Sequence, residues 1–320
     1  MTLHVCAPGY EKFLARELPG GAGKTGPGWV LGPGGPGELC FAHLSLRDPV
    51  EVSGKSVNAI SWAIADLFMD AARGERFETA WPFCLEAAGV DGLNRRAKSV
   101  AEACGERLRG RMSRVAKLAA PGRPEAGPAR GLFAYMTGFD RAYVARDAVA
   151  GGQRRMADDP QAPSRSYLKV EEAYRILGRE PAAGEIVADL GAAPGGWSYS
   201  AARRGALVTA VDNGPMKSGG LHPGVAHRAQ DAFAFRPERP ADWLFCDMVE
   251  DPERVVALVD RWLREGWCRR FVVNLKFGRA DPIALLRRAE TIRRSCALLK
   301  IRHLFHDREE LTLVGERRPS

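Results

Sequence analysis

The residues of this sequence best suited to binding a ligand are those of a glycine-rich turn and the carboxylates on either side of it. The turn, DLGAAPGGW at residues 189–197, follows an apolar segment at 186–190 and precedes a helix predicted to begin at Trp197. Small residues let the backbone approach a ligand closely, and free N–H groups at the start of a helix can donate hydrogen bonds. Asp212 ends the next predicted strand, at 207–211, where a carboxylate can accept hydrogen bonds from ribose hydroxyls. The pattern is typical of a site for a nucleoside-like ligand.

The spacing within this turn narrows the choice of ligand. The spacing of its glycines is not the G-x-G-x-x-G of dinucleotide-binding proteins. Pro194 also stiffens the loop, which suits a ligand without a pyrophosphate. A nucleoside without a pyrophosphate, S-adenosylmethionine above all, therefore fits better than NAD. A plain tight turn without a ligand is the alternative.

Two further carboxylates are expected at the same place. Asp231 follows the region of the third strand and could hydrogen-bond an adenine ring, and Asp247 ends an apolar segment at 243–246. Either acid taken alone is more often the cap of a loop than a ligand. Because the carboxyl ends of parallel strands meet at one edge of a sheet, their positions in line with the glycine-rich turn favour the ligand interpretation.

A lysine at the end of a strand supplies a candidate proton acceptor. Lys276 ends the predicted strand at 271–275 and would share the active edge with Asp247. Lys169 precedes the first strand of the series, and Glu310 opens the last. Two lysines and two carboxylates at one edge could position a ribose 2′-hydroxyl and help remove its proton for in-line attack on the methyl group of a sulfonium. Each lysine taken singly is more simply interpreted as a solvated surface residue.

The elements that must position these residues alternate between helix and strand from Ser164 onward. Helical spacing of apolar residues predicts an amphipathic helix at 169–177. The remaining pattern predicts strands at 186–190, 207–211, 243–246, 271–275 and 311–314, and helices from 197, near 253–265 and at 282–298. Such alternation predicts an α/β fold, a Rossmann-like, doubly wound parallel sheet that binds ligands beyond the carboxyl ends of its strands.

The first 150 residues follow a different pattern. We expect helices at 10–18 and 57–72, a strand at 39–42, and two strands at 131–139 and 141–146 around a Gly-Phe-Asp turn. The glycine-dense stretch at 19–37 predicts loops and a hairpin. These features indicate an N-terminal α+β region with an antiparallel sheet over 1–150, a linker over 151–163, and the Rossmann-like domain over 164–320.

The composition limits the class of protein. The 320 residues are 45% hydrophobic and 27% charged, which fits a folded core and excludes wholesale disorder. No apolar run approaches the roughly 20 residues that span a bilayer, and the N-terminus lacks a signal-peptide pattern, so we expect a cytoplasmic protein with no membrane partner. The seven cysteines form no CxxC pair and the histidines show no HExxH spacing, so we expect neither a disulfide framework nor a metal site.

The net charge of +8 indicates an anionic partner. Most of the excess lies at 93–123, predicted as one helical segment, which holds nine basic residues and two acids. The basic residues are Arg95, Arg96, Lys98, Arg107, Arg109, Arg111, Arg114, Lys117 and Arg123. The segment predicts a phosphate-binding patch for RNA, and a solvated basic face is the alternative. A second cluster on the predicted helix at 282–298, formed by Arg287, Arg288, Arg293 and Arg294, is less specific.

One motif resembles a nucleotide-binding loop without meeting its requirements. Gly23-Lys24-Thr25 ends like a P-loop, but Leu18 stands where the first glycine of that motif is required. The segment before it also has a helical rather than a strand-like pattern. We therefore expect no ATP or GTP site here.

Several motifs, taken in order, resemble one known family. DLGAAPGGWSY, VDNGPM, CDMVEDP, GWC, NLK and HDREELT look like the bacterial 23S rRNA 2′-O-ribose methyltransferase M family, within the FtsJ-like methyltransferases. APSRSYLKVEEA, at 162–173, resembles the segment that leads into that family's catalytic domain, and LHVCAPGYEKFLARE is a weaker match to its opening segment. The resemblance is dense from Arg141 to the end. It implies S-adenosylmethionine as methyl donor, 23S rRNA as partner and a cytidine as target, with a ferredoxin-like piece and a THUMP-like RNA-binding domain in residues 1–150.

The resemblance also implies roles for individual residues. Lys169, Asp247, Lys276 and Glu310 match the Lys-Asp-Lys-Glu tetrad of FtsJ-like enzymes, with Lys276 as the proton acceptor; Glu309 is adjacent to Glu310, and a one-residue shift would exchange them. The turn and the resemblance together give the donor-binding residues Ser166, Gly191, Ala193, Pro194, Gly195, Gly196, Trp197, Asp212, Asp231 and Asp247. After Lys276, the run FGRA departs from the family's Pro-containing, more basic stretch, so we expect different substrate contacts there.

Three functions remain open at this point. The first is methyl transfer to a ribose 2′-oxygen of large-subunit rRNA. The second is the same chemistry on tRNA or another RNA, and the third is an RNA-binding protein that retains the fold but catalyses nothing. The presence of both Lys276 and Asp247 argues against the third. We infer no obligate protein partner.

Overall fold

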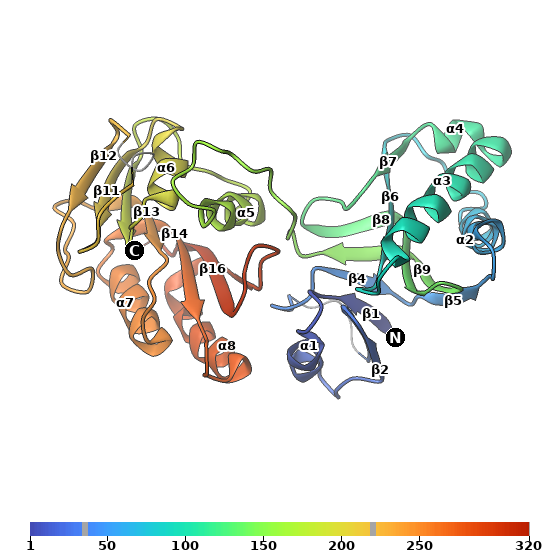
Figure 1. Ribbon diagram of the computed structural model, residues 1–320, viewed down its shortest axis with the longest axis horizontal. Coiled ribbons are helices and arrows are strands. Elements are labelled where there is room, and N and C mark those ends of the chain that lie inside the picture. Colours follow the sequence, from blue (N-terminus) through green and yellow to red (C-terminus); the bar gives the residue numbers. More distant parts are fainter. Residues whose placement is uncertain (34–37, 218–221, 320) are drawn as a thin grey trace. The chain divides into compact units, whose positions relative to one another are not determined.

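The computed structural model describes residues 1–33, 38–217 and 222–319. The chain divides into two compact units, Met1–Gly152 and Gln153–Ser320 (Figure 1). Residues 34–37 of the predicted glycine-dense loop lie outside the described residues. Most of the segment expected as a linker, 151–163, falls within the second unit. In the part of the chain that is described, no helix is long and apolar enough to cross a membrane.

The N-terminal unit is an α+β structure built on one mixed sheet. Its helices are α1 (Glu11–Glu17), α2 (Val57–Ala71), α3 (Leu93–Arg111) and α4 (Ser113–Ala116). Its strands are β1 (Thr2–Val5), β2 (Lys24–Gly26), β3 (Trp29–Gly32), β4 (Leu44–Arg47), β5 (Val50–Ser53), β6 (Trp81–Ala87), β7 (Ala119–Pro121), β8 (Gly127–Gly138) and β9 (Arg141–Ala150). The strands follow the order β2-β3-β1-β4-β9-β8-β6-β7, and β5 also pairs with β9. Because β6 runs parallel to both β7 and β8, the sheet is mixed and not antiparallel throughout as expected.

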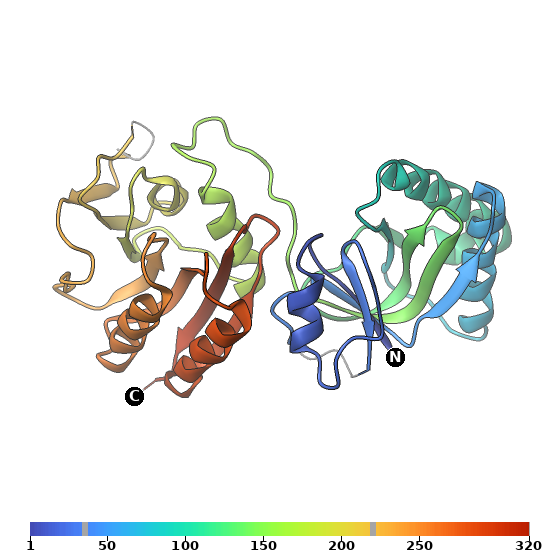
Figure 2. The same ribbon diagram turned by 60° about the horizontal axis from the view of Figure 1, so that its bottom comes forward.

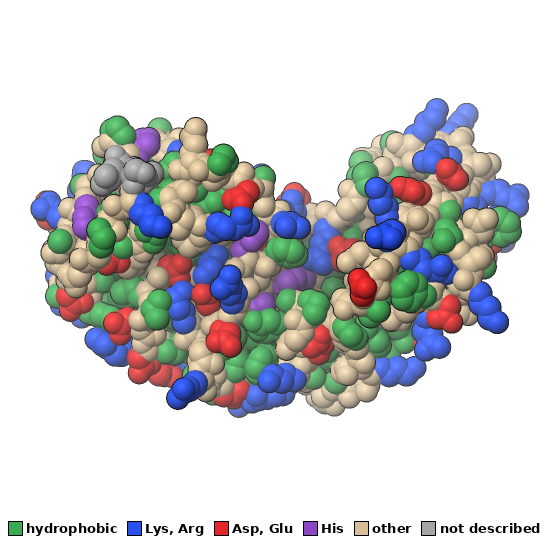
Figure 3. Space-filling view, in the orientation of Figure 1, with side chains coloured by type: hydrophobic (Ala, Val, Ile, Leu, Met, Phe, Trp, Pro, Cys, Tyr) green, Lys and Arg blue, Asp and Glu red, His purple; other side chains and the backbone are tan. Residues whose placement is uncertain are grey.

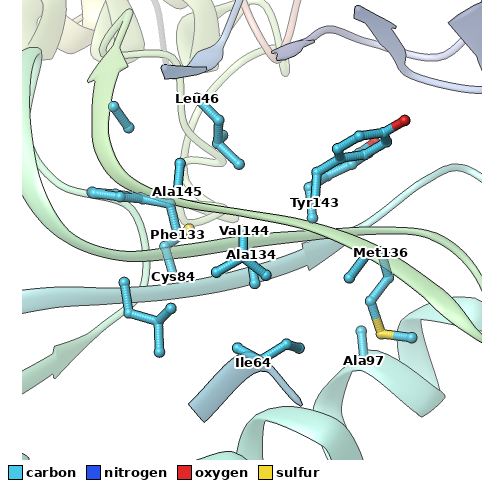
Figure 4. Packing of buried hydrophobic residues seen from close by; sticks show 14 of the residues in the cluster. Leu46, Ile64, Cys84, Ala97, Phe133, Ala134, Met136, Tyr143, Val144 and Ala145 are labelled. Atoms are coloured by element: carbon cyan, nitrogen blue, oxygen red, sulfur yellow. The ribbon is translucent and has the colours of Figure 1, made fainter. Parts of the chain in front are cut away.

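Apolar side chains at helical spacing pack α2 and α3 on this sheet. Ile64 of α2 and Ala97 of α3 lie on the side toward which Ala134 and Met136 of β8 point (Figure 4). All four side chains are buried, and burying an apolar side chain of the size of isoleucine contributes about 1.5–3 kcal/mol. Core packing therefore fixes one face of α3 and leaves its other face to solvent.

Two further expectations for the N-terminal unit are wrong. Residues 39–42 form no strand, because the amides of Cys40 and Phe41 donate to the Glu17 carboxylate at 2.8 and 2.9 Å instead of to a neighbouring strand. The helical segment expected over 93–123 ends at Arg111, where Met112 leaves the helical conformation (φ −144°, ψ 61°). The chain continues through the single turn of α4 into β7.

The C-terminal unit is the predicted doubly wound α/β sheet. Its helices are α5 (Tyr167–Leu177), α6 (Gly196–Ala202), α7 (Pro252–Arg264), α8 (Pro282–Glu290) and the 3-10 helix η2 (Thr291–Ser295). Its strands are β10 (Ile186–Leu190), β11 (Leu207–Val211), β12 (Val225–Arg228), β13 (Ala241–Cys246), β14 (Cys268–Lys276), β15 (Cys296–Arg302) and β16 (Glu310–Arg317). The order is β12-β11-β10-β13-β14-β16-β15, with α5 and α6 on one face and α7 and α8 on the other (Figures 1 and 2).

The last two strands depart from the expected pattern. The helix predicted at 282–298 ends at Glu290, and β15 follows the short η2. Pairing with β16 makes this segment a strand, in which Cys296, Leu299 and Ile301 are buried. Strand β16 then returns antiparallel to both β14 and β15, so the sheet is not parallel throughout. This reversal brings the start of β16 to the carboxyl end of β14.

Candidate active site

The carboxyl ends of neighbouring strands meet at one edge of the C-terminal sheet. Leu190 of β10 is level with Val211 of β11 on one side and with Cys246 of β13 on the other. The glycine-rich turn therefore leaves β10 between the residues that follow these strands, Asp212 and Asp247. The strand order changes direction between β10 and β13, which is where open α/β sheets bind their ligands.

The four residues predicted to act together do lie together at this edge. Lys276 is level with Glu310 in the register of β14 and β16. Lys276 Nζ lies 2.6 Å from Asp247 Oδ1 and 3.0 Å from Glu310 Oε1. Lys169, in the first turn of α5, forms an ion pair with Glu310 Oε2, and its Nζ is 3.9 Å from Asp247 Oδ2. We call this ring of alternating charge the tetrad.

Burial distinguishes the tetrad from ordinary surface charges. The Lys169 and Lys276 side chains are only 12% and 21% exposed, so the interpretation of either as a solvated surface lysine is wrong. Glu309, the alternative fourth member, is exposed. It contributes its backbone carbonyl, which accepts a hydrogen bond from the Phe277 amide at 2.9 Å. The strand register thus selects Glu310.

The sequence left open which way the Lys276 pKa shifts. Burial lowers the pKa of the ammonium group, but the charges of Asp247 and Glu310 outweigh burial and raise the Lys276 pKa above its ordinary value. Burial likewise works to raise the Glu310 pKa, and the two lysines bring it below its ordinary value. The resting site therefore holds a protonated Lys276 beside an ionised Glu310.

Three buried polar residues beneath the tetrad were not predicted. Asn274 Nδ2 donates to Asp247 Oδ1 at 3.3 Å. The Asn274 carbonyl oxygen contacts the Thr312 hydroxyl, and Thr312 Oγ1 also lies 2.9 Å from Asp307 Oδ2. This buried row of contacts, Asp307 to Thr312 to Asn274, thus leads to Asp247, a member of the tetrad.

Part of this row has a signal in the sequence. Asn274 precedes Lys276 by two residues, and Thr312 follows Glu310 by two. Alternate residues of a strand share a face, so this period of two could have identified both. Asp307 lies in the loop between β15 and β16, where no such period applies.

Several backbone N–H groups of the glycine-rich turn have hydrogen-bond partners within the protein. Gly191 and Gly195 donate their N–H groups to backbone carbonyls at 2.9 and 2.7 Å, and Ala193 donates to Asp212 Oδ2 at 3.0 Å. These three N–H groups precede α6, which begins at Gly196, so they do not test the expectation of free N–H groups at the start of the helix. Pro194, between them, has no N–H to offer.

Close packing explains why glycine stands at two positions of the turn. Gly191 has φ +74°, and a Cβ there would overlap the Met248 side chain. A Cβ on Gly196 would lie 2.5 Å from Ser164 Oγ and 2.7 Å from Ser166 Oγ. The indole N–H of Trp197 donates to the Ser166 carbonyl at 2.9 Å, so the turn is fixed against the start of α5. Ser166, Gly196 and Trp197 are thus packed against one another where the turn meets α5.

The carboxylate of Asp212 gives the test of which ligand fits. Its two oxygens accept from the Ala193 and Gly214 amides at 3.0 and 2.6 Å, and lone pairs remain on each oxygen. A carboxylate with lone pairs to spare can accept hydrogen bonds from ribose hydroxyls, so the nucleoside of S-adenosylmethionine fits this residue. Asp231 is exposed and caps a turn by accepting from the Phe233 amide at 2.9 Å. Within the described residues, no group of three or more His, Cys, Asp or Glu could hold a metal ion.

The basic residues of the N-terminal unit fall into two sets. Arg107 forms a bidentate ion pair with Asp66 at 2.8 and 2.7 Å, and Arg123 does the same with Glu86 at 2.6 and 2.7 Å. Arg96 donates to backbone carbonyls, among them that of Lys55 at 2.8 Å. The six that stay exposed, here called the α3 patch, are Arg95, Lys98, Arg109, Arg111, Arg114 and Lys117. Figure 3 shows basic side chains over the α3–α4 end of this unit.

The second basic cluster is largely offset by acids. Arg288 Nε lies 2.7 Å from Glu253, and Arg293 Nε lies 2.6 Å from Glu290. Arg294 pairs with Asp260 at 3.5 Å. Of the two clusters, the α3 patch is therefore the stronger candidate for binding a polyanion.

Comparison with known proteins gives consistent results. The FtsJ-like methyltransferase family matches residues 162–264. Ribosomal RNA large subunit methyltransferase M of Chromohalobacter salexigens is 34% identical over an alignment of 356 positions that covers 96% of this chain and 95% of the relative. The proteins of the same name from Halorhodospira halophila and Laribacter hongkongensis are 43% and 47% identical, over 55% and 51% of this chain. The chain aligns with about half the length of these two relatives, 53% and 50%. TrmN from Thermus thermophilus, a solved structure, is 16% identical over 98% of this chain and 99% of its own, with a TM-score of 0.37.

Proposed function

The chain belongs to the ribosomal RNA large subunit methyltransferase M family, and from this premise we propose that it transfers the methyl group of S-adenosylmethionine to a ribose 2′-hydroxyl of 23S rRNA, with a cytidine as its target. The observation that carries this proposal is the tetrad, whose two ammonium and two carboxylate groups lie at the ligand-binding edge of the sheet. A ribose hydroxyl is a weak acid, so the reaction gains from a positioned proton acceptor. An rRNA substrate would place the reaction in the bacterial cytoplasm.

Each site residue has a task in this reaction. S-adenosylmethionine supplies, when bound, a methyl group on a positively charged sulfur. Asp212 accepts hydrogen bonds from the ribose hydroxyls of the donor, and the glycine-rich turn lets the backbone approach its nucleoside closely. The ribose oxygen attacks in line, the new carbon–oxygen bond forms as the carbon–sulfur bond breaks, and the hydroxyl proton passes to Lys276 Nζ.

The charges around Lys276 determine when it can accept that proton. Asp247 and Glu310 hold its Nζ at 2.6 and 3.0 Å and so fix its position. They also raise its pKa, so the amine must first release a proton to become an acceptor. Lys169 is the second cation at the edge and pairs with Glu310. The rate of transfer should therefore increase with pH through the neutral range.

The N-terminal unit has the task of binding the RNA. We assign residues 1–150 as an RNA-binding region of the THUMP-like type and residues 164–320 as the catalytic domain. The exposed cations of the α3 patch would contact phosphates without reading sequence, and each contact releases counterions. Affinity for RNA should therefore fall as the salt concentration rises.

The test is to map ribose methylation in cells with and without this gene. Loss of one 2′-O-methyl group in 23S rRNA, restored by the wild-type gene and not by the Lys276→Ala variant, is the expected result. Loss of a methyl group from tRNA instead would move the substrate to another RNA. Unchanged methylation of all RNA would favour a binding protein without catalytic activity.

A further inference from the structure

The buried row beneath the tetrad has a defined direction of hydrogen bonding. Asn274 and Thr312 are fully buried, and Asp307 is 8% exposed, so these groups must satisfy one another. The Asp247 carboxylate can only accept hydrogen bonds, which requires the Asn274 amide to turn its Nδ2 toward it. The Asn274 carbonyl oxygen then faces Thr312. Because that oxygen can only accept, Thr312 donates its one hydroxyl hydrogen to Asn274.

Thr312 therefore has no hydrogen left to donate to Asp307. Thr312 Oγ1 and Asp307 Oδ2 lie 2.9 Å apart, so the hydrogen between them must come from Asp307. Asp307 Oδ2 also accepts from the Leu304 amide at 2.9 Å. A carboxylic acid hydroxyl can do both at one atom, whereas a carboxylate oxygen cannot donate.

Resting on the proposed function, we propose that Asp307 is held as an uncharged acid and is a positioning residue, which orients Asp247 through Thr312 and Asn274. Its hydroxyl donates to Thr312, Thr312 donates to Asn274, and Asn274 donates to Asp247. The last bond fixes the Asp247 carboxylate so that Oδ1 receives Lys276 and Oδ2 turns toward Lys169.

The groups that face Asp307 are consistent with this state. Burial raises the pKa of Asp307 well above its ordinary value, and the charge of Glu310 on β16 adds to this rise. The hydrogen bond from the Leu304 amide, the charge of Lys169 on α5 and the contact with Thr312 oppose the rise without cancelling it. His303, on the loop that carries Asp307, adds no charge at neutral pH, because burial lowers its pKa to about 4.

The uncharged state of Asp307 keeps the charges of the site balanced. With Asp307 uncharged, two lysines face two carboxylates. An ionised Asp307 would add a third negative charge, which would hold the proton on Lys276 more firmly and make it a poorer acceptor. An uncharged acid can orient Asp247 without this cost.

Two substitutions at Thr312 test the row by kinetics. Thr312→Val keeps the shape and removes the hydroxyl, so Asn274 loses its donor and Asp247 is held less well. We expect kcat to fall about 10- to 100-fold, with the KM for S-adenosylmethionine unchanged, as is typical for loss of a group that orients a ligand or catalytic residue. The rise of kcat with pH should move to higher pH, because Asp247 then relies more on Lys276. Thr312→Ser, which restores the hydroxyl, should return both toward the wild type, and a Thr312→Val enzyme with wild-type kcat and pH profile would overturn the proposal.

Infrared spectroscopy tests the protonation of Asp307 without relying on activity. In the whole protein with carbonyl-labelled aspartate, a band of a protonated carboxylic acid should be present at neutral pH and absent in Asp307→Asn. Asp189→Asn is the matched control, because burial raises the pKa of Asp189 to about 7 and its acid form also contributes. Should Asp307→Asn fail to fold, Thr312→Val should shift the same band, since the acid loses its acceptor. A wild-type spectrum with only the Asp189 band would overturn the proposal, whereas a wild type that carries the Asp307 band but methylates no RNA would contradict the proposed function alone.

Discussion

The two units of this protein use their charged residues in opposite ways. In the C-terminal unit, four charges are largely buried, paired within 4 Å and held by the ends of β13, β14 and β16 and the first turn of α5. In the N-terminal unit, the six cations of the α3 patch are exposed. Buried, paired charges act at short range, through position, and are screened little by salt. Exposed charges of one sign act at longer range on any polyanion, and salt weakens them. The comparison indicates chemistry in one unit and RNA affinity in the other.

The largest expected effect is loss of transfer when Lys276 is removed. Lys276→Ala should lower single-turnover methylation about 100- to 10,000-fold, the range that general base catalysis contributes. S-adenosylmethionine binding, measured by calorimetry, should change little, because no predicted donor contact is removed. Transfer at the wild-type rate would remove the proposed proton acceptor from the mechanism.

The next effect compares two adjacent glutamates. Glu310→Gln removes a buried partner of two lysines and should lower the free energy of unfolding by about 3–5 kcal/mol, with an accompanying loss of activity. Glu309→Gln, at an exposed side chain, should change it by no more than about 0.5 kcal/mol. Chemical denaturation of both variants measures the difference. Equal effects would mean that the strand register does not select Glu310.

Two aspartates at the same edge allow a similar comparison for the methyl donor. Asp212→Ala should weaken S-adenosylmethionine binding about tenfold or more, the size of a lost hydrogen bond to a charged group. Asp231→Ala should weaken it less, because Asp231 is exposed and already caps its own turn. Calorimetry with the isolated protein decides between them. Binding of NADH in place of S-adenosylmethionine would contradict the assignment of the ligand.

The smallest expected effect concerns the α3 patch. Arg109, Arg111 and Arg114 changed together to alanine should lower RNA affinity up to about tenfold and reduce its salt dependence, with cofactor affinity unchanged. Arg107 is left in place because its ion pair with Asp66 joins α3 to α2. As a matched control, Arg288, Arg293 and Arg294 changed to alanine should alter the salt dependence less, since acids already offset them. An unchanged salt dependence in the first variant would leave the patch a solvated face.

Much of the catalytic unit could be predicted because its strands are short and buried. The apolar runs at 186–190 and 207–211 become β10 and β11 with the same bounds. The segment after Glu290 was mistaken for helix, because its arginine-rich start continues a helical pattern and only the pairing with β16 makes it a strand. The number of exposed cations in the segment 93–123 was overestimated, since the acids that neutralise Arg107 and Arg123 come from distant elements, α2 and β6.

The candidate site shows the same limit in its electrostatics. Sequence motifs could predict the members of the tetrad, but the choice of Glu310 over Glu309 depends on the register between β14 and β16. The direction in which the Lys276 pKa shifts depends on the balance between burial and two nearby charges. The distances to those charges cannot be read from the sequence. Asp307 could not be predicted in the same way, because a loop residue belongs to no periodic pattern.

The most direct test of the central claim is the single-turnover methylation rate of a 23S rRNA fragment, measured against pH for the wild type and Lys276→Arg. The wild-type rate should rise with pH through the neutral range, because the raised pKa of Lys276 keeps its amine mostly protonated there and the small deprotonated fraction grows as the pH rises. Lys276→Arg should bind S-adenosylmethionine normally and show no transfer at any pH, because a guanidinium does not release its proton. A Lys276→Arg enzyme with a near-wild-type rate would contradict proton transfer to Lys276 and leave this residue only an electrostatic role.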